Sequence, residues 1–121
     1  MSLETILNDL KKDVKIFGSV LIHDSGIPIA TDLPQNMPLD KEKISMIFAA
    51  VLLTSEQGVV DNNFGNLDRV SIRGEKGEMF LFRVKEDLLL CILAPRDISY
   101  GILILSVKNA INRLTSVELE K

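Results

Sequence analysis

The spacing of apolar residues changes along the N-terminal third of the chain, and each change predicts a new element. Residues 3–14 carry Leu, Ile and Val at intervals of three and four, which predicts an amphipathic helix capped by Ser2. Residues 17–22 are mostly aliphatic and lead into Asp-Ser-Gly at 24–26, a sequence typical of a tight turn. A returning strand is predicted over residues 27–30, and Pro28 within it favours an edge position.

The remaining two thirds predict two further helices and three further strands. Residues 31–39 contain two prolines and predict a loop, after which Asp40 is a suitable N-cap for a helix to about Gln57. A second loop is predicted over 59–66. Alternating or continuous apolar runs then predict strands at 67–73, 78–85 and 88–94, joined by turns at 74–77 and 86–87, and a last helix at about 98–117.

This order of elements predicts the fold class. Neighbouring strands are joined by tight turns, so the five-stranded sheet should be mainly antiparallel. Residues 88–94 are uninterruptedly apolar, which predicts a central strand covered on both faces. Helices on both faces make a three-layer α-β-α sandwich of the α/β class, and we expect one domain over residues 1–121.

The predicted second helix has apolar residues on two sides. One group is large and is expected to pack on the sheet: Ile44, Ile47, Phe48, Val51 and Leu52. A second stripe at the same spacing contains Met46, Ala49, Ala50 and Leu53. Small residues allow close approach of another helix, so this stripe predicts contact with another chain, most simply a second copy. The alternative is burial beneath a loop such as 31–39.

The predicted third strand points to the same contact. It contains no proline, and at the far edge of the sheet its backbone groups would be free to pair with another chain. We therefore expect a dimer with a continuous sheet, formed by two copies or by paralogous chains. The residues predicted at this interface are Met46, Ala49, Ala50, Leu53, Leu67, Arg69, Val70, Ser71, Ile72 and Arg73.

Composition narrows the kinds of partner. The chain has 14 Lys and Arg against 17 Asp and Glu, a net charge of −3. This balance argues against nucleic acid or an anionic membrane as the main partner. The longest strongly apolar run, 44–53, is well short of the roughly 18 residues of a membrane span, so no membrane insertion is expected. The N-terminus does not resemble a signal peptide, and a cytoplasmic location is expected.

The sequence offers no catalytic constellation. It lacks the glycine-rich phosphate-binding motifs, and the glycines at 74 and 77 flank two charged residues in a turn. The one histidine, His23, precedes Asp24 and could form half of an acid–base pair, but a strand-end role is favoured. The one cysteine, Cys91, is expected to be a buried apolar group. We expect no enzyme activity, no cofactor and no metal.

Several segments together resemble the roadblock/dynein light chain domain family. Residues 18–34 read GSVLIHDSGIPIATDLP, which is similar to that family's first strand, turn and second strand. The small-residue apolar helix at 44–54 is similar to its second helix, 75–82 to its hairpin, and 88–93 with 97–105 to its closing strand and helix. The resemblance covers about residues 3–117.

The resemblance implies a profilin-like sandwich with strand order 2-1-5-4-3 and dimers joined through the third strand and second helix. It also implies a non-catalytic platform for small Ras-like GTPases, some members of which stimulate GTP hydrolysis without lending an arginine finger. The GTPase contact would fall on the exposed parts of 40–57, with Lys41, Lys43 and Glu56 at its rim.

One alternative is a small-molecule sensor domain with the same strand order, or an adaptor subunit of a larger signalling or motor complex. A sensor needs a cavity with polar groups facing inward. The predicted core positions of the central strands are apolar and do not favour it: Val20, Ile22, Phe80, Phe82, Leu90 and Ile92.

Overall fold

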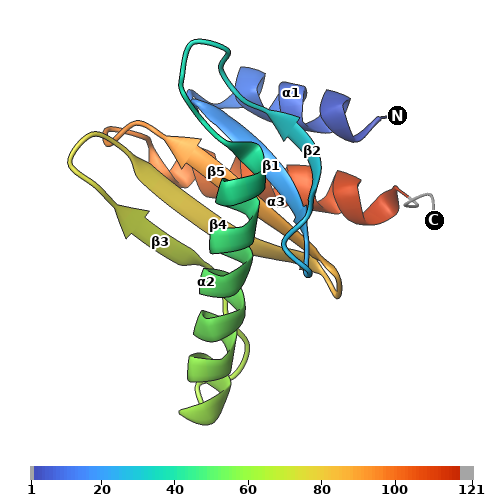
Figure 1. The fold of residues 1–121 in the computed structure, drawn as a ribbon, viewed down its shortest axis with the longest axis vertical. Helices are drawn as coiled ribbons and strands as arrows, with labels where there is room; N and C mark the ends of the chain where they lie inside the picture. The colour runs from blue at the N-terminus through green and yellow to red at the C-terminus, as the bar shows by residue number, and fades with distance from the viewer. Residues whose placement is uncertain (1, 118–121) are drawn as a thin grey trace.

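The computed structural model of this chain describes residues 2–117, and they form three helices and five strands (Figure 1). The elements in chain order are α1 Leu3–Asp13, β1 Gly18–His23, β2 Pro28–Asp32, α2 Lys41–Asp61, β3 Val70–Arg73, β4 Glu78–Lys85, β5 Leu88–Ala94 and α3 Tyr100–Ser116. The predicted caps of the first two helices are confirmed. Ser2 Oγ accepts from the Thr5 N–H, and the Asp40 carboxylate accepts from the N–H groups of Glu42 and Lys43.

All neighbouring strands of the sheet run antiparallel, in the order β2-β1-β5-β4-β3. The order and the sandwich fold agree with the prediction from the sequence and the resemblance. β5 lies at the centre and every one of its residues is buried, as its continuous apolar run predicts. β2 forms one edge, where Pro28 removes no hydrogen bond to a further strand.

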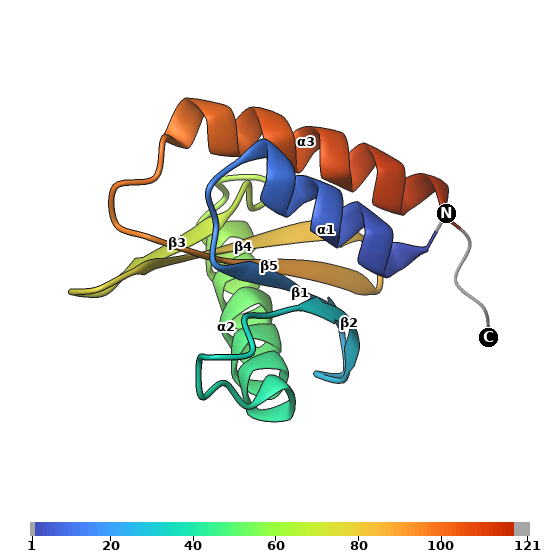
Figure 2. The same cartoon turned by 90° about the horizontal axis from the view of Figure 1, so that it is seen from above.

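The helices cover the two faces of the sheet unequally (Figure 2). α1 and α3 lie side by side on one face, and their shared core with the sheet includes Leu7, Phe80, Leu90 and Leu103. α2 alone covers the other face, over a smaller core that includes Val20, Leu52 and Cys91. On that second face, half-buried apolar side chains of the sheet lie near the β3 edge, at Val70, Ile72 and Met79.

The largest differences from the predicted boundaries are in α2 and β3. α2 continues past Gly58 to Asp61 and ends at Asn62 and Asn63, where the backbone of Asn63 turns left-handed at a φ of 60°. In Figure 1 this end of α2 extends beyond the sheet. β3 is shorter than expected and covers only 70–73, so the predicted interface residues Leu67 and Arg69 precede the strand.

By length and composition α2 would be long and apolar enough to cross a membrane. Core helices of proteins outside membranes meet the same criterion, so the observation is weak on its own. Here one side of α2 is packed on the sheet through Ser45, Phe48, Ala49 and Leu52. The mean hydropathy of the helix therefore reflects a buried face plus apolar residues that remain at the surface.

Candidate protein–protein interface

The orientation of α2 is fixed by the residues that it buries. Ser45, Phe48, Ala49 and Leu52 face the sheet, and the Ser45 hydroxyl donates to the Lys41 carbonyl oxygen at 2.7 Å, so no polar group is left unpaired there. Each residue advances a helix by about 100°. Residues 44, 47 and 51 therefore lie on one flank of α2, and residues 46 and 53 lie on the other.

The flank that carries residues 46 and 53 faces the turn between β1 and β2. Gly26 in that turn has a φ of +93°, and a Cβ placed on it would stand 3.3 Å from Met46 Cα and 4.0 Å from Ala49 Cβ. Ala49 is buried beneath this turn. The neighbouring apolar residues remain at the surface, where Met46 and Ile27 are each 63% exposed and Leu53 is 40% exposed. We call Ile27, Met46 and Leu53 the turn-side patch.

The opposite flank of α2 faces the β3 edge of the sheet. It carries Ile44, Ile47 and Val51, of which Ile47 is 48% exposed and the other two are half-buried. The apolar side chains of the neighbouring sheet positions, Leu67, Val70, Ile72 and Met79, are also only half-buried. We call Ile44, Ile47 and Val51, together with these sheet residues, the edge-side patch. It runs directly up to a strand that has no outer neighbour among the described residues.

The exposures on these two flanks change which α2 residues are available for the predicted interface. Ala49 was expected at the surface, and this prediction is wrong because the β1–β2 turn covers it and it is only 3% exposed. Ile47 was expected on the sheet and is instead exposed. Met46 and Leu53 are exposed as predicted, but on the flank away from β3. Ala50 lies exposed on the crest between the flanks.

The predicted edge strand is present, and its hydrogen-bonding groups follow from its turn. Gly74 N–H donates to the Gly77 carbonyl oxygen at 2.8 Å, which makes these two a hydrogen-bonded pair. In an antiparallel ladder such pairs alternate, so Val70 and Ile72 bond to β4, and the N–H and C=O groups of Ser71 and Arg73 point away from the sheet. β3 thus offers two residues with outward backbone groups for pairing with another strand.

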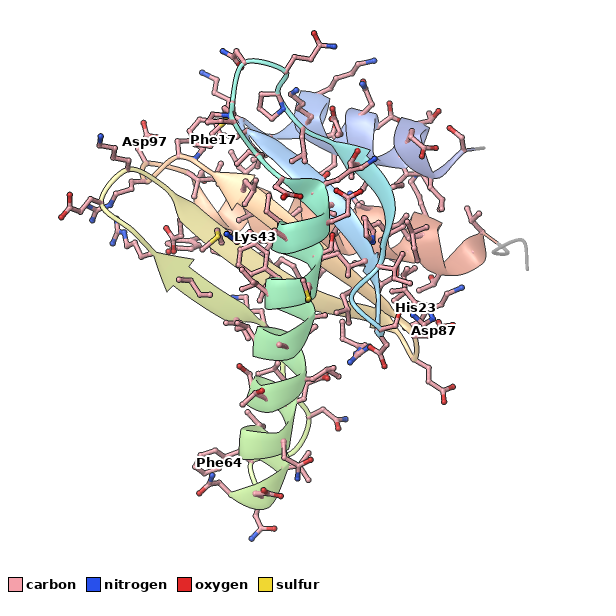
Figure 3. The ribbon with its side chains drawn as sticks, in the orientation of Figure 1. Phe17, His23, Lys43, Phe64, Asp87 and Asp97 are labelled. Atoms are coloured by element: carbon pink, nitrogen blue, oxygen red, sulfur yellow. The ribbon has the colours of Figure 1, made fainter. Side chains whose placement is uncertain are left out.

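The predicted rim residues at the two ends of α2 differ in character. Lys41 and Lys43 are exposed in its first turn, and Figure 3 shows Lys43 projecting from the helix. Glu56 is not a free charge. It accepts two hydrogen bonds from Arg83 on β4, at 3.0 Å from Nε and 2.6 Å from Nη2, while Arg83 Nη1 lies 2.5 Å from Asp24 Oδ1. The hydrogen bond to Glu56 is the main cause of a raised Arg83 pKa.

A second polar cluster lies at the β3 edge, and no pattern in the sequence predicts it. Glu78 is only 3% exposed at the start of β4, and Tyr100 at the start of α3 donates its hydroxyl to Glu78 Oε2. Arg73 Nε lies 3.9 Å from Glu78 Oε1. The Tyr100 ring also meets Phe80 edge to face, with 5.5 Å between ring centroids. This cluster ties the end of β3 to the helix on the other face.

The groups weighed for catalysis have structural roles. His23 Nδ1 accepts the Ser25 N–H at 3.0 Å and lies 2.8 Å from the Ser25 hydroxyl, so it closes the β1–β2 turn. Cys91 is fully buried in β5, and burial raises the pKa of its thiol, which keeps it protonated and unreactive. Within residues 2–117 no three His, Cys, Asp or Glu side chains gather as a metal site would require.

The comparison with protein families matches residues 2–94 to the Roadblock/LC7 domain. The chain belongs to the Roadblock/LC7 domain family. This confirms the family proposed from the sequence. Two uncharacterized proteins of Methanocaldococcus jannaschii, MJ0310 and MJ1340, are each 24% identical over 115 residues, which covers 95% of this chain and 98% of each relative.

Solved structures of roadblock proteins share the fold. MglB of Myxococcus xanthus superposes with a TM-score of 0.86 at 18% identity, covering 93% of this chain and 91% of MglB. A Roadblock/LC7 domain from Streptomyces avermitilis also gives 0.86, at 13% identity with 95% and 96% covered. A further MglB structure, described as having a tetrameric arrangement, gives 0.84 at 15% identity with 93% and 84% covered. At these identities the likeness establishes the roadblock backbone for this chain.

Proposed function

We propose that this roadblock chain is a non-catalytic, cytoplasmic regulator or scaffold that forms a dimer and binds a small Ras-like GTPase. The observation that carries the proposal is the pair of apolar patches on opposite flanks of α2. One helix that exposes Met46, Ile47 and Leu53 has more apolar surface than a monomer in water needs. Two flanks permit two different partners at the same time.

We assign the edge-side patch to a second copy of the chain. A strand added to the free edge of β3 would bring a second α2 alongside the first on the same face of the sheet. Ile47 and Val51 would then be covered together with Val70 and Ile72 of the edge. Ser71 and Arg73 would satisfy their outward backbone groups. A paralogous chain could occupy the same edge. The oligomeric state of the purified chain on its own distinguishes a homodimer from a heterodimer.

We assign the turn-side patch to the GTPase. Ile27, Met46 and Leu53 face away from β3 and would stay uncovered in the dimer. The resemblance to roadblock domains implies a GTPase contact on the exposed part of α2, and the exposed Lys41 and Lys43 in the first turn of this helix would be charged residues at its rim. The chain would act by holding and reshaping the GTPase. A change in the rate of GTP hydrolysis would be a property of the complex and has to be measured on it.

A matched pair of substitutions on the two flanks tests both assignments. Light scattering of the unmodified chain should give twice 13.5 kDa. Ile47→Glu places a charge in the edge-side patch and should give a folded monomer. Leu53→Glu places the same charge in the turn-side patch and should stay dimeric. Their helical content by circular dichroism is the control for folding.

Capture of candidate GTPases in both nucleotide states completes the test. The unmodified dimer should retain a GTPase in one nucleotide state, and Leu53→Glu should lose it, with hydrolysis rates measured on the same complexes. A dimeric Ile47→Glu variant would contradict the assignment of the edge-side patch. A Leu53→Glu variant that captures the GTPase as well as the unmodified chain would contradict the turn-side assignment.

A further inference from the structure

We infer that two copies of the chain pair through β3 in one particular register, with Ile72 on the two-fold axis and the partner's β3–β4 turn in a basic groove beside α3. This inference rests on the proposed dimer and specifies its geometry. It is drawn from three independent features: the side to which each β3 residue points, the backbone groups that are free, and the charges on either side of the strand.

Symmetry limits the possible registers. A two-fold axis normal to the sheet keeps both α2 helices on one face, so residues that oppose each other across the new seam must point to the same face. Val70 and Ile72 pair with Leu81 and Met79 on the α2 face, whereas Ser71 pairs with Phe80 on the α3 face. Only registers that place a residue opposite its own copy satisfy this condition. Within the strand the candidates are Val70, Ser71, Ile72 and Arg73, and an axis at Arg73 would place two like charges directly opposite each other.

The free backbone groups favour Ile72. With Ile72 on the axis, Ser71 faces the partner's Arg73, and both residues turn their N–H and C=O groups outward, so four hydrogen bonds form within β3 as it stands. With Val70 or Ser71 on the axis, Arg69 must take part in the pairing, and Arg69 precedes the strand. The Ile72 register needs no residue outside β3.

The charges favour the same register. With Ile72 on the axis, the partner's Glu75 comes alongside Arg69, and the partner's Lys76 comes alongside Asp68, so each copy contributes two pairs of opposite charge. With Ser71 on the axis, Arg69 would oppose the partner's Arg73, which is a pair of like charge. With Val70 on the axis, Asp68 would oppose the partner's Ile72, which adds no opposite charge to the Arg69 of its own chain, whose Nη1 lies 2.6 Å from Asp68 Oδ2.

A groove lies where the partner's turn would arrive. It has a volume of about 350 Å³ between α3 and the segment before β3. Its apolar walls include Ile104, Ile111 and Leu67. Three cations line it, Arg69, Arg83 and Lys108, against one carboxylate, Asp68, which lies 2.6 Å from Arg69 Nη1. The partner's Glu75 lies at the corner of the turn that follows Arg73, so the turn would bring this carboxylate to the end of the groove where Arg69 lies. The groove and the turn are therefore complementary in charge.

Engineered disulfides test the register directly. On the axis a residue meets its own copy, whereas a residue one position away is displaced along the seam beyond the roughly 7 Å that a disulfide spans. Ile72→Cys should give a covalent dimer under mild oxidation, and Ser71→Cys and Val70→Cys should not. The native Cys91 is fully buried and should stay unreactive in all three variants, and the unmodified chain serves as the blank.

Charge reversal tests the turn. Arg69→Glu should weaken the dimer on the order of tenfold in Kd, because each reversal acts twice in a symmetric pair. Glu75→Arg should do the same, and the double variant should recover most of the loss. Glu86→Arg, in the turn at the other end of β4, is the matched control and should leave Kd unchanged. Ultracentrifugation at low and high salt measures Kd for the unmodified chain and for the four variants.

The outcomes separate this inference from the proposed dimer. A covalent dimer through Ile72, with recovery in the double charge variant, supports the register. A dimer that crosslinks through Ser71 or Val70, or in which the reversals do not compensate, overturns the register and leaves the dimer standing. A monomer at every concentration tested, with the fold intact, overturns both.

Discussion

Arg83 on β4 and Glu56 on α2 form a two-pronged ion pair that joins the helix to the sheet across 27 positions of sequence. Asp24 in the β1–β2 turn binds the same guanidinium, and the Glu86 carbonyl oxygen accepts from it at 3.1 Å. One side chain therefore connects three segments at this end of the molecule. All three charged side chains remain partly exposed, so solvent weakens the attraction.

Replacing Arg83 with Ala should lower the free energy of unfolding by about 1–2 kcal/mol, since two carboxylates lose a charged hydrogen-bond donor in a partly screened site. Arg83→Lys keeps the charge but loses the planar fork, and should fall in between. Urea unfolding at one fixed protein concentration measures both variants. An Arg83→Ala variant with an unchanged midpoint would show that the three segments are held by packing alone.

The neighbouring alanines of α2 should respond in opposite ways to the same substitution. Ala49→Glu buries a carboxylate beneath the β1–β2 turn and should cost about 3 kcal/mol or more, enough to unfold much of the protein. Ala50→Glu is exposed and should leave the fold intact. Thermal unfolding followed by circular dichroism compares the two. Equal melting temperatures would mean that the rotation of α2 described here is wrong.

Gly58 lies inside α2 with nothing within 4 Å of an added Cβ. Gly58→Ala should therefore stabilise the protein by about 0.5–1 kcal/mol, because alanine loses less backbone freedom in a helix. Gly26→Ala is the contrasting variant and should destabilise, since Gly26 has a φ of +93° and an added Cβ would stand 3.3 Å from Met46 Cα. The two variants are compared by chemical unfolding, and a destabilised Gly58→Ala would indicate that α2 ends before this residue.

The hydrogen bond from Tyr100 to Glu78 should be visible by ultraviolet titration. Tyr100 is the only tyrosine and the chain has no tryptophan, so its phenolate band stands alone. The hydrogen bond to Glu78 is the main cause of a raised Tyr100 pKa. The stabilisation from this bond is present below the ordinary tyrosine pKa of about 10 and is lost as the pH rises through the raised value.

Glu78→Gln should move the Tyr100 titration back toward the ordinary value, because a neutral amide no longer penalises the phenolate. The titration midpoint of the variant is compared with that of the unmodified chain under conditions where both remain folded. Identical midpoints would exclude Glu78 as the cause of the shift.

Local patterns were sufficient to predict the elements of this fold. Turn residues at 24–26 and 74–77 separate strands whose apolar content matches their burial, and the two N-caps lie where Ser2 and Asp40 indicate. The strand order came from the family resemblance. The uninterrupted apolar run of β5 independently placed that strand at the centre.

The rotation of α2 could not be predicted in the same way. A helix with apolar residues on both sides has no single hydrophobic direction, so its pattern permits more than one orientation. The orientation is set by Gly26, whose lack of a side chain lets the β1–β2 turn close over Ala49. The ion pair of Arg83 and Glu56 could not be predicted for a related reason. The two residues meet only when α2 and β4 are packed together.

The position of β5 has a consequence for how the chain acquires this shape. β1 is complete by residue 23, yet its inner neighbour begins at residue 88 and must enter between β1 and β4. Such distant pairing slows folding, because a long loop has to close before its contacts are gained. While the protein is being synthesised, the early hairpin and α2 have no central strand to pack on. A chain whose synthesis stops before residue 94 would expose apolar surface. Rapid completion of synthesis or binding by a chaperone would protect it from aggregation.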